Sequence, residues 1–130
     1  MFEKLPPYSV EAEEAVLGAC LLDHEAIDKA ASILSSSDFY RPSHQKIFDC
    51  LTALSAKGQK PDAVLLGEAL KVRGELEEVG GAAFVGKLMD ETPSSANVEY
   101  YAAIVFDKSR RRKLLSSCAV IQSAAYDEDD

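Results

Sequence analysis

The stretch SVEAEEAVLGACLL, residues 9–22, decides the fold class of this chain. Ser9 is a good helix cap, and the glutamates that follow it suit the positive end of a helix dipole. Small and apolar residues then recur at the spacing of one buried helical face, namely Ala12, Ala15, Val16 and Ala19. The pattern predicts a core helix close to the N-terminus.

Caps and breakers divide the rest of the chain into five further helical segments. These begin after Asp23, Ser43, Pro61, Gly81 and Asn97. The last segment continues to Ile121, and we expect a break in it near Ser109. No stretch shows the strict alternation of a half-buried strand. The sequence therefore predicts an all-α protein, a compact bundle of about six helices with a C-terminal helical extension.

Composition indicates an ordinary globular domain. The 130 residues are 47% hydrophobic and 28% charged, which is enough apolar material for one core without disulfides or metals. No apolar run is long enough to cross a bilayer, and the first residues do not resemble a signal peptide. We therefore expect a cytoplasmic protein with no membrane partner.

The charge is unevenly distributed. A net charge of −8 argues against a surface that binds nucleic acid throughout. One basic cluster stands out, formed by Arg110, Arg111, Arg112 and Lys113. It has three interpretations: a solvated helix face, interchain ion pairs in an oligomer, or DNA phosphate contacts. The third ranks lowest, because no aromatic platform lies nearby in the sequence.

Candidates for chemistry are few. Cys20, Cys50 and Cys118 lie in apolar stretches and are expected to be buried, structural thiols, while His24 and His44 follow helix-start residues and lack metal-ligand spacing. The segment from Gly81 to Lys87 imitates a phosphate loop, but Leu88 replaces the required hydroxyl. The carboxylates are expected on solvated helix faces. We predict no catalytic residue, no metal and no cofactor in this chain.

The helical extension is a candidate interaction surface. Residues 114–126 are apolar or small around much of the helix, and no later segment of the sequence would cover them. The expected dimer or partner interface consists of Leu114, Leu115, Val120 and Ile121. The alternative is that the extension folds back on the body.

The order of short motifs resembles the opening of bacterial replicative DNA helicases of the DnaB type. The matching motifs are PP at 6–7, EAE at 11–13, AVLG at 15–18, LLD at 21–23, DFY at 38–40, HQKIF at 44–48, LEEVGG at 76–81, PSSAN at 93–97 and YYA at 100–102, followed by Ile104-Val105. Together they cover residues 6 to about 118, nearly the whole sequence.

The resemblance implies the N-terminal domain of a hexameric helicase. In that family a C-terminal RecA-like motor, whose motifs this sequence lacks, binds ATP and magnesium, contacts most of the DNA and moves 5′ to 3′. The N-terminal domains form a collar of dimers through helical hairpins, and primase binds the collar. Glu11 and Phe84 are the residues implied to face primase, and residues 109–126 correspond to the first arm of the hairpin.

The expected organisation is an N-terminal arm (1–8), a globular helical domain (9–107), a helical extension (108–126) and an acidic tail (127–130). Two other functions stay open. The chain could be a stand-alone helical DNA-binding regulator, although Leu65 and Leu66 occupy its would-be recognition helix. It could also be the helicase-binding domain of a primase, although that domain lies at a C-terminus.

Overall fold

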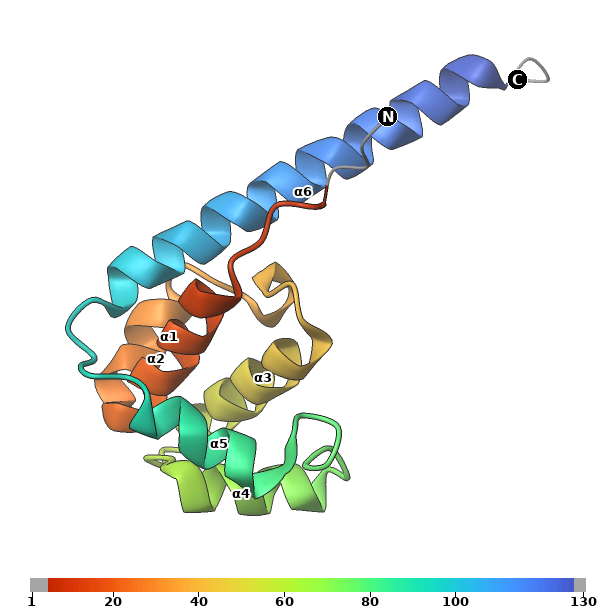
Figure 1. The fold of residues 1–130 in the computed structure, drawn as a ribbon. Coiled ribbons are helices and arrows are strands. Elements are labelled where there is room, and N and C mark those ends of the chain that lie inside the picture. The colour runs from red at the N-terminus through yellow and green to blue at the C-terminus, as the bar shows by residue number, and fades with distance from the viewer. Residues whose placement is uncertain (1–4, 128–130) are drawn as a thin grey trace.

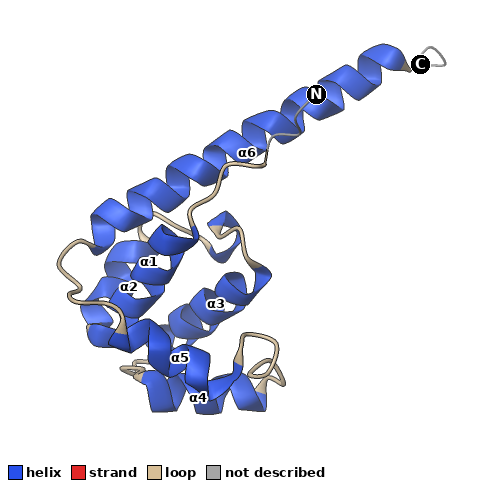
Figure 2. Ribbon diagram, in the orientation of Figure 1, coloured by secondary structure: helices blue, strands red, loops and turns tan. Residues whose placement is uncertain are grey.

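The computed structural model describes residues 5–127, and every regular element in that part of the chain is helical (Figures 1 and 2). The elements are α1 (Val10–Leu22), α2 (His24–Ala31), the short 3-10 helix η1 (Ser36–Asp38), α3 (Pro42–Ala56), α4 (Ala63–Val72), α5 (Gly81–Asp90) and α6 (Val98–Tyr126). The predicted all-α class is confirmed. The expected acidic tail, apart from Asp127, and the first half of the expected N-terminal arm lie outside the described residues.

Helix α1 is the centre of the body. It packs against α2, α3, α5 and α6, and Figure 1 shows it enclosed by these helices. A helix that is covered on several sides must be apolar around most of its circumference. This explains why a continuous run from Val16 to Leu21 is buried, rather than a single stripe. The hydroxyl of Ser9 caps the helix by accepting a hydrogen bond from the Ala12 N–H at 3.1 Å.

The close approach of α1 and α5 depends on Gly18. A Cβ atom at this position would lie 1.8 Å from Oγ1 of Thr92 and 2.5 Å from the carbonyl oxygen of Leu88. The absence of a side chain therefore lets the two helices touch backbone to backbone. At the other end of α5, Gly80 and Gly81 have φ values of 110° and 77°, which allow the tight turn into the helix.

Helix α6 is one continuous helix of 29 residues, so the expected break near Ser109 is wrong. Ser109 is buried, and its hydroxyl donates a hydrogen bond to the body while the helical backbone continues. The first part of α6 packs on the body through Val98, Ala102 and Val105. The second part projects away from it (Figure 1), and every residue from 113 to 127 is exposed. The extension therefore does not fold back.

Two boundaries also differ from the sequence prediction. Helix α3 begins at Pro42 instead of after Ser43, because proline suits the first helical position, where no N–H partner is needed. Helix α2 ends at Ala31, and the serine run 35–37 supplies the cap and the first two residues of η1.

Candidate interaction surfaces

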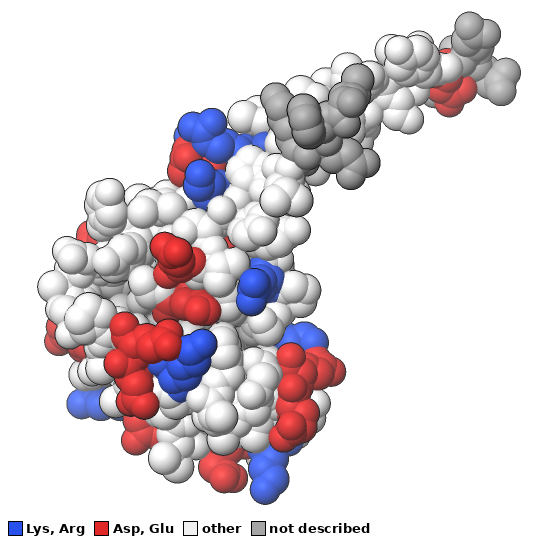
Figure 3. Space-filling view, in the orientation of Figure 1, with Lys and Arg blue, Asp and Glu red and all other residues white. Residues whose placement is uncertain are grey.

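The first candidate surface is the projecting part of α6, residues 114–126, called here the arm. The sequence of the arm contains no charged residue, and Figure 3 shows it as a white rod beyond the charged body. The four predicted interface residues are all on it, with exposed fractions of 65% for Leu114, 56% for Leu115, 69% for Val120 and 68% for Ile121. Large apolar side chains this exposed indicate a surface that a partner covers.

The arm has one continuous apolar stripe. Leu114, Cys118, Ile121 and Ala125 are separated by alternating steps of four and three residues, which place them on one side of a helix. Leu115 flanks this stripe, whereas Val120 lies about 120° around the helix from Leu114. The structure thus aligns Leu114 with Ile121 and sets Val120 on a different side.

The predicted basic cluster is divided among separate intramolecular contacts. Arg110 and Arg111 pair with Asp107 at 3.4 and 2.9 Å, and both arginine side chains are largely exposed, whereas Asp107 is half-buried. The hydrogen bond from Arg111 is the main cause that lowers the pKa of Asp107. Lys113 pairs with Asp38 at 3.3 Å, while Arg112 donates to backbone carbonyls of the body. The cluster is therefore not one surface, and Arg112 in particular is not a solvated residue.

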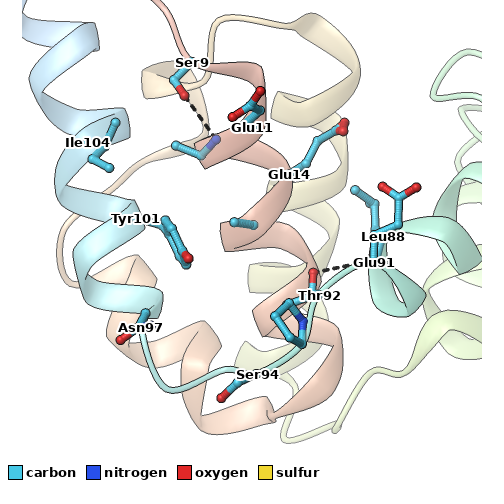
Figure 4. A pocket seen from close by; sticks show the side chains of 13 residues that line it. Ser9, Glu11, Glu14, Leu88, Glu91, Thr92, Ser94, Asn97, Tyr101 and Ile104 are labelled. Carbon is cyan, nitrogen blue, oxygen red and sulfur yellow. Dashed lines mark hydrogen bonds between the residues drawn. The ribbon is translucent and has the colours of Figure 1, made fainter.

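The second candidate surface is a groove of about 440 Å³ between the start of α1, the end of α5 and the start of α6 (Figure 4). Its apolar wall includes Ala15, Leu88 and Ile104. Carboxylates of Glu11, Glu14 and Glu91 stand along it, and no lysine, arginine or histidine is among its lining residues. A groove of this composition suits a basic segment with an apolar anchor.

Phe84, the other residue implied to face primase, does not line this groove. It lies half-buried on α5, and its ring stacks against the imidazole of His44 with 6.2 Å between the ring centroids. The structure therefore brings Glu11 into a concave surface and gives Phe84 a packing role at least in part.

Sequence reasoning missed a polar cluster in the core. Glu13 is fully buried, and its Oε1 lies 2.7 Å from Nδ1 of His44, which is also fully buried. The expectation that the carboxylates lie on solvated faces is wrong for Glu13. His44 does lie in the first turn of α3, but its side chain is buried against Glu13, which its position at a helix start did not predict. One sequence signal could have placed Glu13 inward: it precedes Leu17 by one helical turn on a helix that is apolar all round.

The three cysteines do not share one environment. Cys20 and Cys50 are buried as expected, but Cys118 is exposed on the arm, which corrects that part of the prediction. Burial raises the pKa of the Cys20 thiol to about 12, so it is not a reactive group.

The segment that imitates a phosphate loop forms the start of α5. Val85 and Leu88 are core residues, and Lys87 pairs with Glu91 at 3.8 Å on the surface. A turn, and no strand, precedes Gly81 within the described chain.

The described residues also contain no group of three or more potential metal ligands. None of the helices over residues 5–127 is both long and apolar enough for a membrane span.

The molecule is a helical domain with an exposed apolar arm and an acidic groove. The chain belongs to the family of DnaB-like helicase N-terminal domains, whose model matches residues 5–107. The resemblance seen in the sequence is thereby confirmed, and the match favours it over the DNA-binding regulator and the primase domain.

Relatives and solved structures agree with this family. The chain is 48% identical over 125 residues to the replicative DNA helicase DnaB of Treponema pallidum (strain Nichols), covering 96% of this chain and 28% of the relative. It is 43% identical over 128 residues to the DnaB of Geobacillus stearothermophilus, covering 98% of this chain and 28% of the relative. The chain thus spans little more than a quarter of the length of these relatives.

The crystal structure of the N-terminal domain of DnaB helicase from Mycobacterium tuberculosis has a TM-score of 0.91 to this fold at 37% identity. It covers 94% of this chain and 88% of that one. A structure of a DnaB-like replicative helicase and its interactions with primase has a TM-score of 0.74 at 26% identity, covering 88% of this chain and 27% of that one.

Proposed function

We propose that this chain is the assembly and primase-interaction domain of a hexameric replicative DNA helicase. In this proposal ATP hydrolysis and most DNA contacts belong to a C-terminal motor that the sequence does not include. The globular domain spans residues 9–107. Residues 108–126, which include the arm, form the first helix of a helical hairpin. The observation that carries the proposal is the exposed, uncharged arm on a domain of this family.

A second copy of the chain is the proposed occupant of the arm. The stripe that contains Leu114 and Ile121 is straight and uncharged, so two identical stripes can pack face to face about a two-fold axis. Leu115 widens the contact on one flank, whereas Val120 lies off the stripe and would reach the partner only at the margin of the contact. Burial of this apolar area stabilises the dimer at roughly 25 cal/mol per Å². Because one arm offers a limited area, we expect a concentration-dependent equilibrium between monomer and dimer.

Sedimentation velocity tests this dimer. We expect the dimer fraction of the wild-type chain to rise with concentration. Leu115→Asp and Ile121→Asp introduce an unpaired charge into the interface and should return the chain to monomer with unchanged helical circular dichroism. Ser123→Asp is the matched control, because it adds the same charge to the side of the arm opposite the stripe. Dimerisation that survives Ile121→Asp, or is lost equally with Ser123→Asp, would contradict the proposed interface.

Primase is the proposed partner of the groove beside Glu11. The carboxylates of Glu11 and Glu14 lie one turn apart on α1 and have the charge that attracts a basic segment, while the apolar wall accepts its anchor side chain. Phe84 would contribute a separate contact on α5. The structure described with primase belongs to a relative, and it supports the choice of this partner.

Calorimetric titration with the helicase-binding domain of the primase from the same organism tests this surface. The double variant Glu11→Gln/Glu14→Gln should weaken binding roughly tenfold, which corresponds to about 1.4 kcal/mol. Glu25→Gln/Asp28→Asn on α2 is a control with the same spacing and the same loss of charge, and it should bind like wild type. Equal weakening in both variants would show a general charge effect and no specific groove.

A further inference from the structure

Three segments that are distant in the sequence meet where α6 leaves the body. They are the N-terminal lead before α1, the loop around η1, and the turn of α6 that contains Ser109 and Arg112. Figure 1 shows the lead running beside α6 at this place. The last core contact of α6 is Val105, so polar groups make the final contacts between helix and body.

Asp38 is the centre of this meeting point. It is buried, and its Oδ1 accepts hydrogen bonds from the Ser109 hydroxyl at 2.7 Å and from Nζ of Lys113 at 3.3 Å. Its Oδ2 accepts the Ser35 N–H at 2.9 Å. Burial alone would raise the pKa of Asp38, but these hydrogen bonds together with the charge of Lys113 lower it. The carboxylate is therefore a charged, fully coordinated anchor for two successive turns of α6.

Arg112 joins the same helix to the other two segments. Its guanidinium donates to the carbonyl oxygen of Asp38 at 2.7 Å and to that of Pro7 at 2.8 Å. It also lies over the ring of Tyr40, which stacks on Tyr8 with 4.3 Å between centroids. The planar guanidinium group can donate to two carbonyl oxygens and stack on an aromatic ring at the same time, which the ammonium group of a lysine cannot do.

We propose that Asp38 and Arg112 are positioning residues that fix the angle at which the arm leaves the body. The lead before α1 is part of this device, because Arg112 binds Pro7 and the Tyr8–Tyr40 stack supports Arg112. The proposal concerns the chain by itself and does not depend on what binds the arm.

Pulsed electron paramagnetic resonance on the full chain measures this angle. Cys118 is the exposed native thiol on the arm, and Val64→Cys supplies a second label on α4, at the opposite end of the body. The labels are placed in the Ile121→Asp background, so that the proposed dimer does not hold the arm. We expect one narrow distance distribution in this parent protein.

In the Arg112→Ala and Asp38→Asn variants, the distribution of distances between the two labels should become broad. The helical circular dichroism should stay as in the parent protein. Arg112→Lys keeps the charge and should still broaden the peak, because the two-carbonyl contact is gone. Arg111→Ala is the matched control, because Arg111 contacts only its own helix through Asp107. The distance distribution of this variant should stay narrow. Narrow peaks in folded Arg112→Lys and Tyr8→Ala variants would overturn the proposal even if Arg112→Ala fails to fold.

Discussion

Glu13 of α1 and His44 of α3 form a buried pair, with Oε1 of the carboxylate 2.7 Å from Nδ1 of the imidazole. The second carboxylate oxygen accepts the Tyr40 N–H at 2.7 Å. One acidic side chain thus joins the central helix to the segment that starts α3. Both side chains are fully buried, so removing one of them leaves the other without its partner in the core, and the pair is sensitive to substitution.

Glu13→Ala should lower the free energy of unfolding by about 3–5 kcal/mol, the cost of leaving buried polar partners unpaired. Urea denaturation followed by circular dichroism measures this loss. Glu25→Ala, which truncates an exposed glutamate of α2, should change stability by less than about 0.5 kcal/mol. A similar small loss in both variants would mean that the buried pair contributes little.

Gly18→Ala should destabilise the protein by about 1–3 kcal/mol, because the added methyl group collides with Thr92 and with the Leu88 carbonyl. Gly67→Ala is the opposite case: it is also a helical glycine, but nothing lies within 4 Å of the added Cβ. It should stabilise by about 0.4–1 kcal/mol through a less flexible unfolded chain. The midpoint of thermal unfolding should therefore fall for Gly18→Ala and rise for Gly67→Ala. Midpoints that shift in the same direction for both variants would refute the close contact between α1 and α5.

The stabilising effect of Asp38 should depend on pH. Since its pKa in the folded protein lies below the ordinary value of 3.8, the ionised form stabilises the fold above that value. This contribution disappears as the pH falls through the lowered pKa. The difference in unfolding free energy between wild type and Asp38→Asn should thus be constant near neutral pH and shrink below pH 3.8. A difference between wild type and Asp38→Asn that stays constant down to acid pH would contradict the prediction.

Thiol reactivity should separate the cysteines. Ellman's reagent should modify Cys118 rapidly in the folded chain, whereas Cys20 and Cys50 should react only on unfolding, because burial raises the pKa of both. Cys118→Ser should remove the rapid phase. If the arm dimerises through its stripe, the rapid phase should also slow as the chain concentration rises. A rapid phase that persists in Cys118→Ser would show that one of the two core thiols is accessible.

Local signals predicted much of the fold. Ser9, Asp23 and Asp62 each accept a backbone N–H at the start of a helix, and the apolar spacing correctly placed α1 in the core. These features depend on residues within one or two helical turns, which is the range over which a sequence pattern is readable. The exposed apolar arm was equally visible, because the residues 114–126 have no charged face.

Long-range polar contacts were not predictable in the same way. Glu13 and His44 are 31 residues apart, and Asp38 and Ser109 are 71 apart. A serine among basic residues indicates a helix end by local propensity, but here a tertiary hydrogen bond to Asp38 compensates for it and α6 continues. The groove beside Glu11 also depends on where three helix ends meet, which periodicity does not specify.

The central place of α1 has a consequence for synthesis on the ribosome. The N-terminal helix emerges first, yet α6, which covers one of its sides, begins only at Val98. At about 5–20 residues per second, the roughly 76 residues from the end of α1 to the start of α6 take about 4–15 s to synthesise. During this interval its apolar sides can be covered only in the order in which α2, α3 and α5 appear. The nascent chain is therefore most exposed to misassociation before α6 is made, and the domain completes its core only when translation has passed beyond that helix.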